Sequence, residues 1–253
     1  MKIKQKKQTK QKKQFLILTV ILLGISVITF SCSKSDSSSP YTCAACHVAP
    51  DALAANDASA KGVYKGIEVG SSGTLSINIQ NGSSTITGTL VLDGITAALT
   101  SSVTYTAGQA YVAPFTGTYN GSAVSITFSV GLSGGAPTVV TSSIPGHPGA
   151  TFTLYKETST SLIEAFEGTY SKTGQTGVFN FLLSRGLNQW GGIALNNASG
   201  STADNISGTI NASNQLIVTG NGTILGTISG DVINGSFLDG NAATVTIIGH
   251  RTL

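Results

Sequence analysis

The chain has few charged residues, and half of its basic ones lie at one end. Only 10% of the 253 residues are charged. Seven of the fourteen Lys and Arg residues are lysines within residues 2–13, a stretch that contains no acid. Beyond residue 31, seven basic side chains stand against eleven acidic ones, which gives a net charge of −4. Nucleic-acid binding needs a basic surface, so the sequence argues against nucleic acid as a partner.

Long apolar runs are also scarce. The one long run spans the sixteen residues 15–30, which carry no charge. As a helix this run would be about 24 Å long, at about 1.5 Å per residue. A bilayer core is about 30 Å thick, so the run is short for a permanent span. A basic segment followed by a short apolar run is typical of a secretory signal and favours it over an uncleaved anchor.

The apolar run ends in Thr29-Phe30-Ser31-Cys32-Ser33. This segment resembles the lipobox of bacterial lipoproteins, in which the cysteine is acylated and becomes the first mature residue. Cys32 and Ser31 match the lipobox, whereas Thr29 and Phe30 depart from the usual leucine and small residue. With the following Ser-Lys-Ser-Asp, this looser form is similar to lipoproteins of the Bacteroidota.

The resemblance implies a signal peptide over residues 1–31 and fatty acylation, such as palmitate, on Cys32. It also implies anchoring in the outer membrane of the cell envelope, on either its periplasmic or its cell-surface face. Residues 33–40 are polar and predict a flexible tether between the anchor and the rest of the chain.

Alternating apolar and hydroxyl-bearing residues dominate the chain beyond residue 60. The pattern is clearest at residues 75–79, 124–130, 152–154 and 245–247, and it predicts strands with one buried face. Asn-Gly at 81, 120, 221 and 234 and Asp-Gly at 93 and 239 are typical of tight hairpin turns. We therefore expect an all-β fold of antiparallel meanders, either barrel or sandwich.

Four short motifs recur along the chain and indicate two related β units. Gly62-Val63-Tyr64 resembles Gly168-Thr169-Tyr170, and the other pairs begin at Ile86 and Ile206, Gly117 and Gly226, and Phe152 and Val245. We expect a first unit over residues 61–160 and a second over residues 161–253. Ser161 and Glu164 near the boundary have the spacing of a helix-capping box and predict a short helical turn.

Residues 32–60 contain the sharpest motif, Cys43-Ala44-Ala45-Cys46-His47. In an exported protein C-x-x-C-H is the attachment site of a c-type haem, with His47 as an iron ligand. Few apolar residues surround it, however, and Met1, the only methionine, is lost with the signal, which excludes His/Met ligation. A disulfide between Cys43 and Cys46 is the favoured alternative. A zinc site would need a fourth ligand, so we expect no metal.

Two further residues are candidates for a binding loop. His147 lies in Pro145-Gly146-His147-Pro148-Gly149, a loop shaped by two prolines and two glycines. Trp190, the only tryptophan, is flanked by glycines and is either an exposed stacking residue or a core residue. Glu164 and Glu167 have the spacing of a solvated helix face, and His250 with Arg251 has the position of an exposed terminal pair.

No nucleophile, base and orienting acid come together in a recognisable motif, so we expect no catalytic residues and no enzyme. The favoured function is a non-catalytic, membrane-anchored lipoprotein whose β units bind a small ligand, an envelope protein or a glycan, or act structurally. This hypothesis needs no cofactor. The alternative is an electron-transfer lipoprotein with one haem c bound by Cys43, Cys46 and His47.

Overall fold

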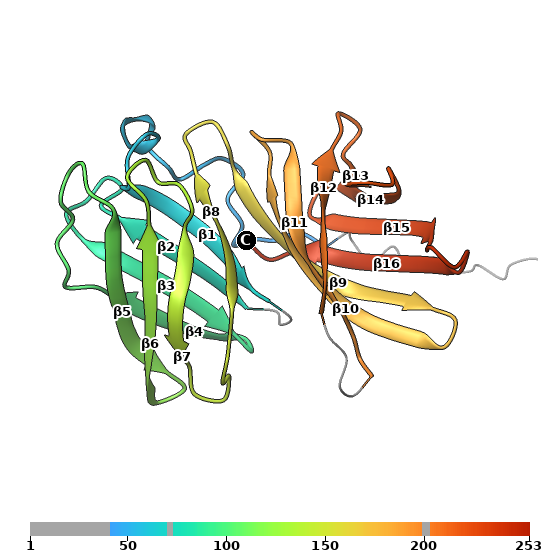
Figure 1. Cartoon of the computed structure of the whole chain (residues 1–253), viewed down its shortest axis with the longest axis horizontal. Coiled ribbons are helices and arrows are strands. Elements are labelled where there is room, and N and C mark those ends of the chain that lie inside the picture. The colour runs from blue at the N-terminus through green and yellow to red at the C-terminus, as the bar shows by residue number, and fades with distance from the viewer. Residues whose placement is uncertain (1–40, 70–72, 199–202) are drawn as a thin grey trace, which may run out of the picture. The chain divides into compact units, whose positions relative to one another are not determined.

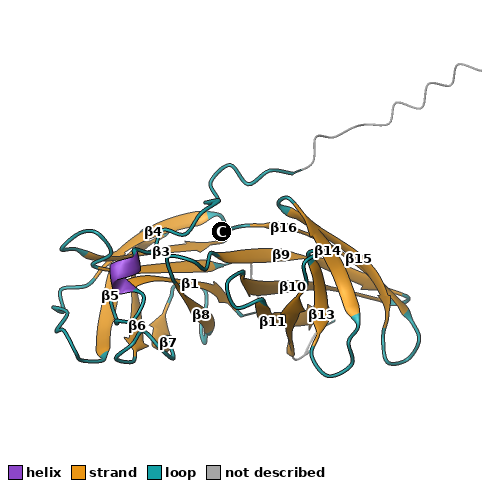
Figure 2. Cartoon of the chain, turned by 90° about the horizontal axis from the view of Figure 1, so that it is seen from above, coloured by secondary structure: helices purple, strands orange, loops and turns teal. Residues whose placement is uncertain are grey.

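The computed structural model describes residues 41–69, 73–198 and 203–253. Within these residues the chain forms sixteen β-strands and one short 3-10 helix, η1 (Ala54–Asn56) (Figures 1 and 2). The all-β prediction is confirmed. The signal peptide, Cys32 and the tether lie outside the described residues. Within the described ranges, no helix has the length and apolar character needed to cross a membrane.

The first eight strands form one antiparallel sheet in which each strand from β1 to β6 pairs with the next. β8 returns to pair with β1, so the sheet is a barrel that lacks only the ladder between β7 and β8. The strands are β1 (Gly62–Glu68), β2 (Thr74–Ile79), β3 (Ile86–Leu92), β4 (Ile95–Thr100), β5 (Tyr111–Tyr119), β6 (Ser122–Val130), β7 (Thr138–Ser143) and β8 (Phe152–Glu157).

The second eight strands form a closed antiparallel meander barrel, in which β16 pairs with β9 (Figure 1). We call it the C-terminal barrel. Its strands are β9 (Ile163–Lys172), β10 (Gln175–Ser184), β11 (Gln189–Asn196), β12 (Ala203–Ile210), β13 (Gln215–Val218), β14 (Ile224–Ser229), β15 (Val232–Leu238) and β16 (Thr244–Arg251).

Alternation placed the inward-facing residues correctly. In β6, Val124, Ile126 and Phe128 are buried, while the hydroxyl-bearing residues between them are half-buried. Phe128 packs against Tyr64, with ring centroids 5.1 Å apart, in the core of the first sheet. An antiparallel strand with one wet face shows this alternation because successive side chains point to opposite faces.

The turn dipeptides were predicted correctly only in part. Asp93-Gly94 and Asn120-Gly121 close two-residue hairpins, and φ is positive at both residues of each pair, as type I′ turns require. The turn predicted at Asn234 is wrong, because this residue lies within β15 opposite Thr227. A Cβ on the following Gly235 would lie 1.9 Å from the Leu225 carbonyl oxygen, so this glycine serves close strand packing.

The four recurring motifs match the two β units only in part. The outer pairs fall on equivalent strands, with Gly62 in β1 and Gly168 in β9, and Phe152 in β8 and Val245 in β16. The inner pairs are displaced by one strand. Ile86 opens the third strand of its sheet, whereas Ile206 lies in the fourth strand of the C-terminal barrel. Gly117 and Gly226 likewise lie in a fifth and a sixth strand, so these echoes come from shared strand composition.

The helical turn predicted at Ser161 and Glu164 is wrong, because β9 begins at Ile163 and includes Glu164. Tertiary packing decides this local structure. Ile163 and Leu182, on the outer side of β9 and β10, are buried against Ile67 of β1. Asn180 also donates a hydrogen bond to the Glu68 carbonyl oxygen at 2.6 Å. The start of β9 is therefore buried on both faces.

Candidate functional site

The C-terminal barrel contains a cavity of about 180 Å³. Its wall is mostly apolar, and includes Phe179, Phe181, Ile233 and Ile247. Its polar residues come from the end of β9 and the starts of β10 and β12. Because neighbouring strands are antiparallel, these positions meet at one end of the barrel, which we call the rim. The cavity thus has an apolar interior and one polar end.

Glycines make the space for this cavity. Gly177 lies opposite Tyr170 in the register, and a Cβ there would lie 2.3 Å from the Tyr170 ring. Gly168 lies opposite Phe179, whose ring a Cβ would approach to 2.7 Å. Both rings therefore lie across glycine backbone on the barrel wall rather than filling the barrel centre.

Stacked aromatic rings form the base of the cavity. Phe179 and Phe181 stack with their centroids 6.1 Å apart, and Phe181 also stacks on Phe166 at 5.3 Å. Trp190 meets Phe181 edge-on at 5.6 Å and is 2% exposed. Its indole N–H donates to the Thr209 carbonyl oxygen at 3.1 Å. Trp190 is therefore a core residue in strand β11 and not part of an exposed loop.

Among the described residues, the charged groups at the rim are the Lys172 ammonium and the carboxylates of Asp239 and Asp204. The Lys172 ammonium, which lines the cavity, lies 2.9 Å from the Asp239 carboxylate. Asp204 is the second acidic residue at the rim and itself lines the cavity. The hydrogen bond from Lys172, with those from the backbone N–H groups of Ala243 and Asn241, lowers the pKa of Asp239. The same bond to Asp239 raises the pKa of Lys172. Gln175 donates a hydrogen bond to the Tyr170 hydroxyl at 3.2 Å.

A lowered pKa means that the Asp239 contacts stabilise the folded state above the ordinary carboxyl pKa, and that this stabilisation is lost as pH falls through the lowered value. We expect an NMR titration to place the Asp239 midpoint below about 3.9, the value of an unperturbed aspartate. Replacing Lys172 with Met is expected to move the midpoint upward. An identical midpoint in both proteins would show that Lys172 does not hold this carboxylate.

His147 lies in the first β unit, away from the barrel cavity. Its Nε2 lies 3.0 Å from the Asp93 carboxylate, and its Nδ1 lies 3.9 Å from Glu68. The Tyr119 ring packs edge-on against the imidazole at 6.0 Å. These contacts fasten the Pro145–Gly149 loop to the hairpin between β3 and β4. The structure does not bring His147 and Trp190 together in one site, because His147 packs on Tyr119 of the first sheet's core and Trp190 belongs to the core of the C-terminal barrel.

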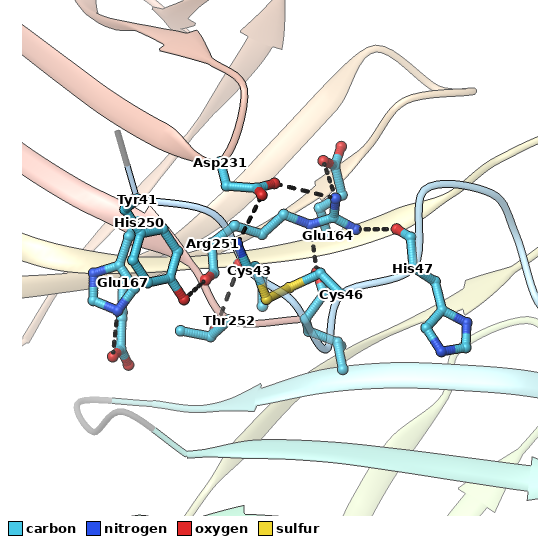
Figure 3. Close-up of a disulfide and its surroundings, with 12 residues drawn as sticks. Tyr41, Cys43, Cys46, His47, Glu164, Glu167, Asp231, His250, Arg251 and Thr252 are labelled. Carbon is cyan, nitrogen blue, oxygen red and sulfur yellow. Dashed lines mark hydrogen bonds and ion pairs between the residues drawn. A yellow bond between two sulfur atoms is a disulfide. The ribbon is translucent and has the colours of Figure 1, made fainter. Parts of the chain in front are cut away.

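A disulfide joins Cys43 and Cys46, whose Cα atoms are 5.3 Å apart (Figure 3). The residues around it are fastened to the C-terminal barrel. The Cys43 N–H donates to Asp231 at 2.8 Å, and the Tyr41 hydroxyl donates to the Arg251 carbonyl oxygen at 2.9 Å. Arg251 also donates to the His47 carbonyl oxygen. Residues 41–47 are therefore docked on the barrel.

The ion pairs behind this docked segment correct two expectations. Arg251 is 4% exposed, and its guanidinium lies 3.4 Å from Glu164 and 3.6 Å from Asp231. Glu164 is also buried and pairs with Arg185. Glu164 is thus not on a solvated helix face, and Arg251 is not an exposed terminal residue. His250 pairs with Glu167 at 3.4 Å and packs on the Tyr41 ring.

The C-x-x-C-H segment does not fit a haem in this arrangement. The two sulfurs that would form thioethers are bonded to each other. Figure 3 shows the His47 imidazole pointing away from the disulfide, and this side chain is 61% exposed and paired with Asp51. A haem needs a water-excluding pocket, and an exposed imidazole among polar groups does not provide one.

Comparison with known proteins found no relative of this chain. No protein-family model, no curated protein and no solved structure matches the chain.

Proposed function

We propose that this protein is an outer-membrane lipoprotein, anchored through acylated Cys32, whose C-terminal barrel binds a small apolar molecule without catalysis. The observation that carries the proposal is the apolar cavity of about 180 Å³ inside a closed barrel with one polar end. A barrel of eight strands has an interior just wide enough for side chains or for one small ligand. Here the aromatic rings lie along the wall and leave the centre for a ligand.

The size of the cavity limits the ligand. Dry apolar cavities of roughly 150 Å³ accommodate benzene, so this one suits a single ring or a short alkyl chain. Each buried CH₂ group contributes about 0.8 kcal/mol. A chain of six carbons therefore supplies enough apolar burial for binding without any charged contact. The net charge of −4 beyond residue 31 is consistent with this proposal and not with a nucleic-acid partner.

Filling the cavity is expected to abolish binding. Ala194 lines the cavity on β11, and Ala194→Phe places a ring in the space that a ligand needs. Isothermal titration of the wild-type protein with 1-hexanol is expected to show saturable binding, and the variant is expected to bind at least about tenfold more weakly, or about 1.4 kcal/mol.

The matched control is Ile248→Phe, which adds a ring on the outward face of β16, where Ile248 is 58% exposed. We expect this variant to bind 1-hexanol as the wild type does. Equal affinity in all three proteins would place the binding elsewhere and refute the proposed function.

The anchor is tested independently of the cavity. Cys32→Ala removes the sulfur that carries the lipid, so we expect the protein to leave the membrane fraction when cells are fractionated. Because the variant lacks the attachment point of the lipid anchor, the loss is expected to be nearly complete. Cys43→Ala is the control, and it is expected to remain in the membrane fraction. Retention of Cys32→Ala in the membrane would instead support an uncleaved signal-anchor.

A further inference from the structure

The rim indicates the chemical class of the ligand. We infer that the cavity takes neutral molecules that carry a single hydroxyl or carbonyl oxygen, such as short-chain alcohols or phenols, in preference to fatty acids of the same size. This inference rests on the proposed function, because it assigns a ligand class to the same cavity.

The charges at the rim disfavour an anionic ligand. Lys172 is the cation that lines the cavity, and the Asp239 carboxylate lies 2.9 Å from it. Asp239 is itself held by the backbone N–H groups of Asn241 and Ala243, each at 2.9 Å from its Oδ1. To pair with Lys172, a ligand carboxylate would have to displace this fastened aspartate. If Asp239 stayed in place, the ligand carboxylate would lie beside a second carboxylate at Lys172, and two like charges repel each other.

The same rim offers hydrogen bonds to a neutral oxygen. The Tyr170 hydroxyl accepts a hydrogen bond from Gln175 at 3.2 Å. A phenolic oxygen that accepts one bond still carries its own proton, which it can donate to a ligand. Both side chains line the cavity beside its apolar wall. A ligand chain on Phe179 and Phe181 would thus place an oxygen near Tyr170.

A cationic head group is disfavoured for a different reason. The Asp204 side chain is exposed, so its attraction is screened by water and salt. An ammonium at the rim would also lie near the Lys172 ammonium. A neutral oxygen avoids both the loss of charge hydration and this repulsion.

Three ligands of equal chain length test the inference: 1-hexanol, hexanoate and hexylamine, titrated at pH 7 into the wild-type protein by calorimetry. We expect 1-hexanol to bind about tenfold more tightly than either charged ligand. Tyr170→Phe is expected to weaken 1-hexanol binding about fivefold, as loss of one hydrogen bond does, and to affect benzene binding less than 1-hexanol binding.

Asp239→Asn gives the most specific test of the role of charge at the rim. It removes the carboxylate that neutralises Lys172, so we expect hexanoate to bind more tightly than in the wild type and the ratio of hexanoate affinity to 1-hexanol affinity to rise. Asp93→Asn, which removes an exposed carboxylate in the first β unit, is the control and is expected to change neither.

The outcomes separate the two proposals. Failure of all three ligands and of benzene to bind would refute the proposed function itself. Equal or tighter binding of hexanoate or hexylamine by the wild type would leave the cavity a binding site and overturn the inference about ligand class.

Discussion

Glu157→Ala is expected to lower the free energy of unfolding by about 3–5 kcal/mol, the effect of removing one partner of a buried ion pair. Glu157 is 0% exposed, and its carboxylate lies 2.7 Å from the ammonium of Lys65, whose side chain is 5% exposed. The carboxylate also accepts hydrogen bonds from the backbone N–H groups of Asp51 and Ile163. The variant leaves a buried ammonium without its nearest carboxylate and two N–H groups without acceptors.

This glutamate joins three parts of the fold, because its partners lie in the segment before β1, in β1 and at the start of β9. Equilibrium unfolding in urea measures the loss. The double variant Lys65→Met/Glu157→Leu serves as the comparison, since apolar replacement of a buried pair is often neutral. We expect it to be more stable than Glu157→Ala alone. A loss below 1 kcal/mol in the single variant would mean that the pair is hydrated and not buried.

Trp190→Ala is expected to destabilise the C-terminal barrel by about 3–5 kcal/mol, as truncation of a large buried aromatic does. The indole is 2% exposed, packs on Phe181 and lies against Gly208, where a Cβ would come within 2.9 Å of it. Its loss leaves a void and removes the donor to the Thr209 carbonyl oxygen.

Leu187→Ala is the matched control for this prediction. Leu187 lies in the loop before β11 and is 65% exposed, so its truncation is expected to change stability by no more than about 0.5 kcal/mol. Because Trp190 is the only tryptophan, unfolding of both variants is followed by circular dichroism. Equal stability of the two variants would show that Trp190 is not a packed core residue.

The strands were predictable from the sequence wherever one face of the strand is exposed to solvent. Alternation along β6 reflects a local period of two, and Asp93-Gly94 and Asn120-Gly121 are local turn signals. Where both faces are buried, as at the start of β9, the alternation disappears, and a helix-capping pattern at Ser161 and Glu164 gave a wrong prediction. The packing that decides this segment comes from Ile67 and Leu182, which are distant in sequence.

The candidate site was harder to predict than the strands. Its rim residues Tyr170, Lys172 and Gln175 face inward at the end of β9 and the start of β10. The sequence signal for this site was a group of polar residues at inward-facing strand positions on both sides of a hairpin. The docking of residues 41–47 had no comparable signal, because it depends on Asp231 and Arg251, which lie 188 and 204 positions after their partners in the chain.

The most direct test of the account is the dependence of binding on ligand size. Titration of the protein with 1-alkanols from propanol to decanol is predicted to show affinity rising about fourfold per methylene, equivalent to about 0.8 kcal/mol. The rise should stop when the chain outgrows a cavity of about 180 Å³. An affinity that does not change with chain length, or that rises without a plateau up to decanol, would contradict binding inside the C-terminal barrel.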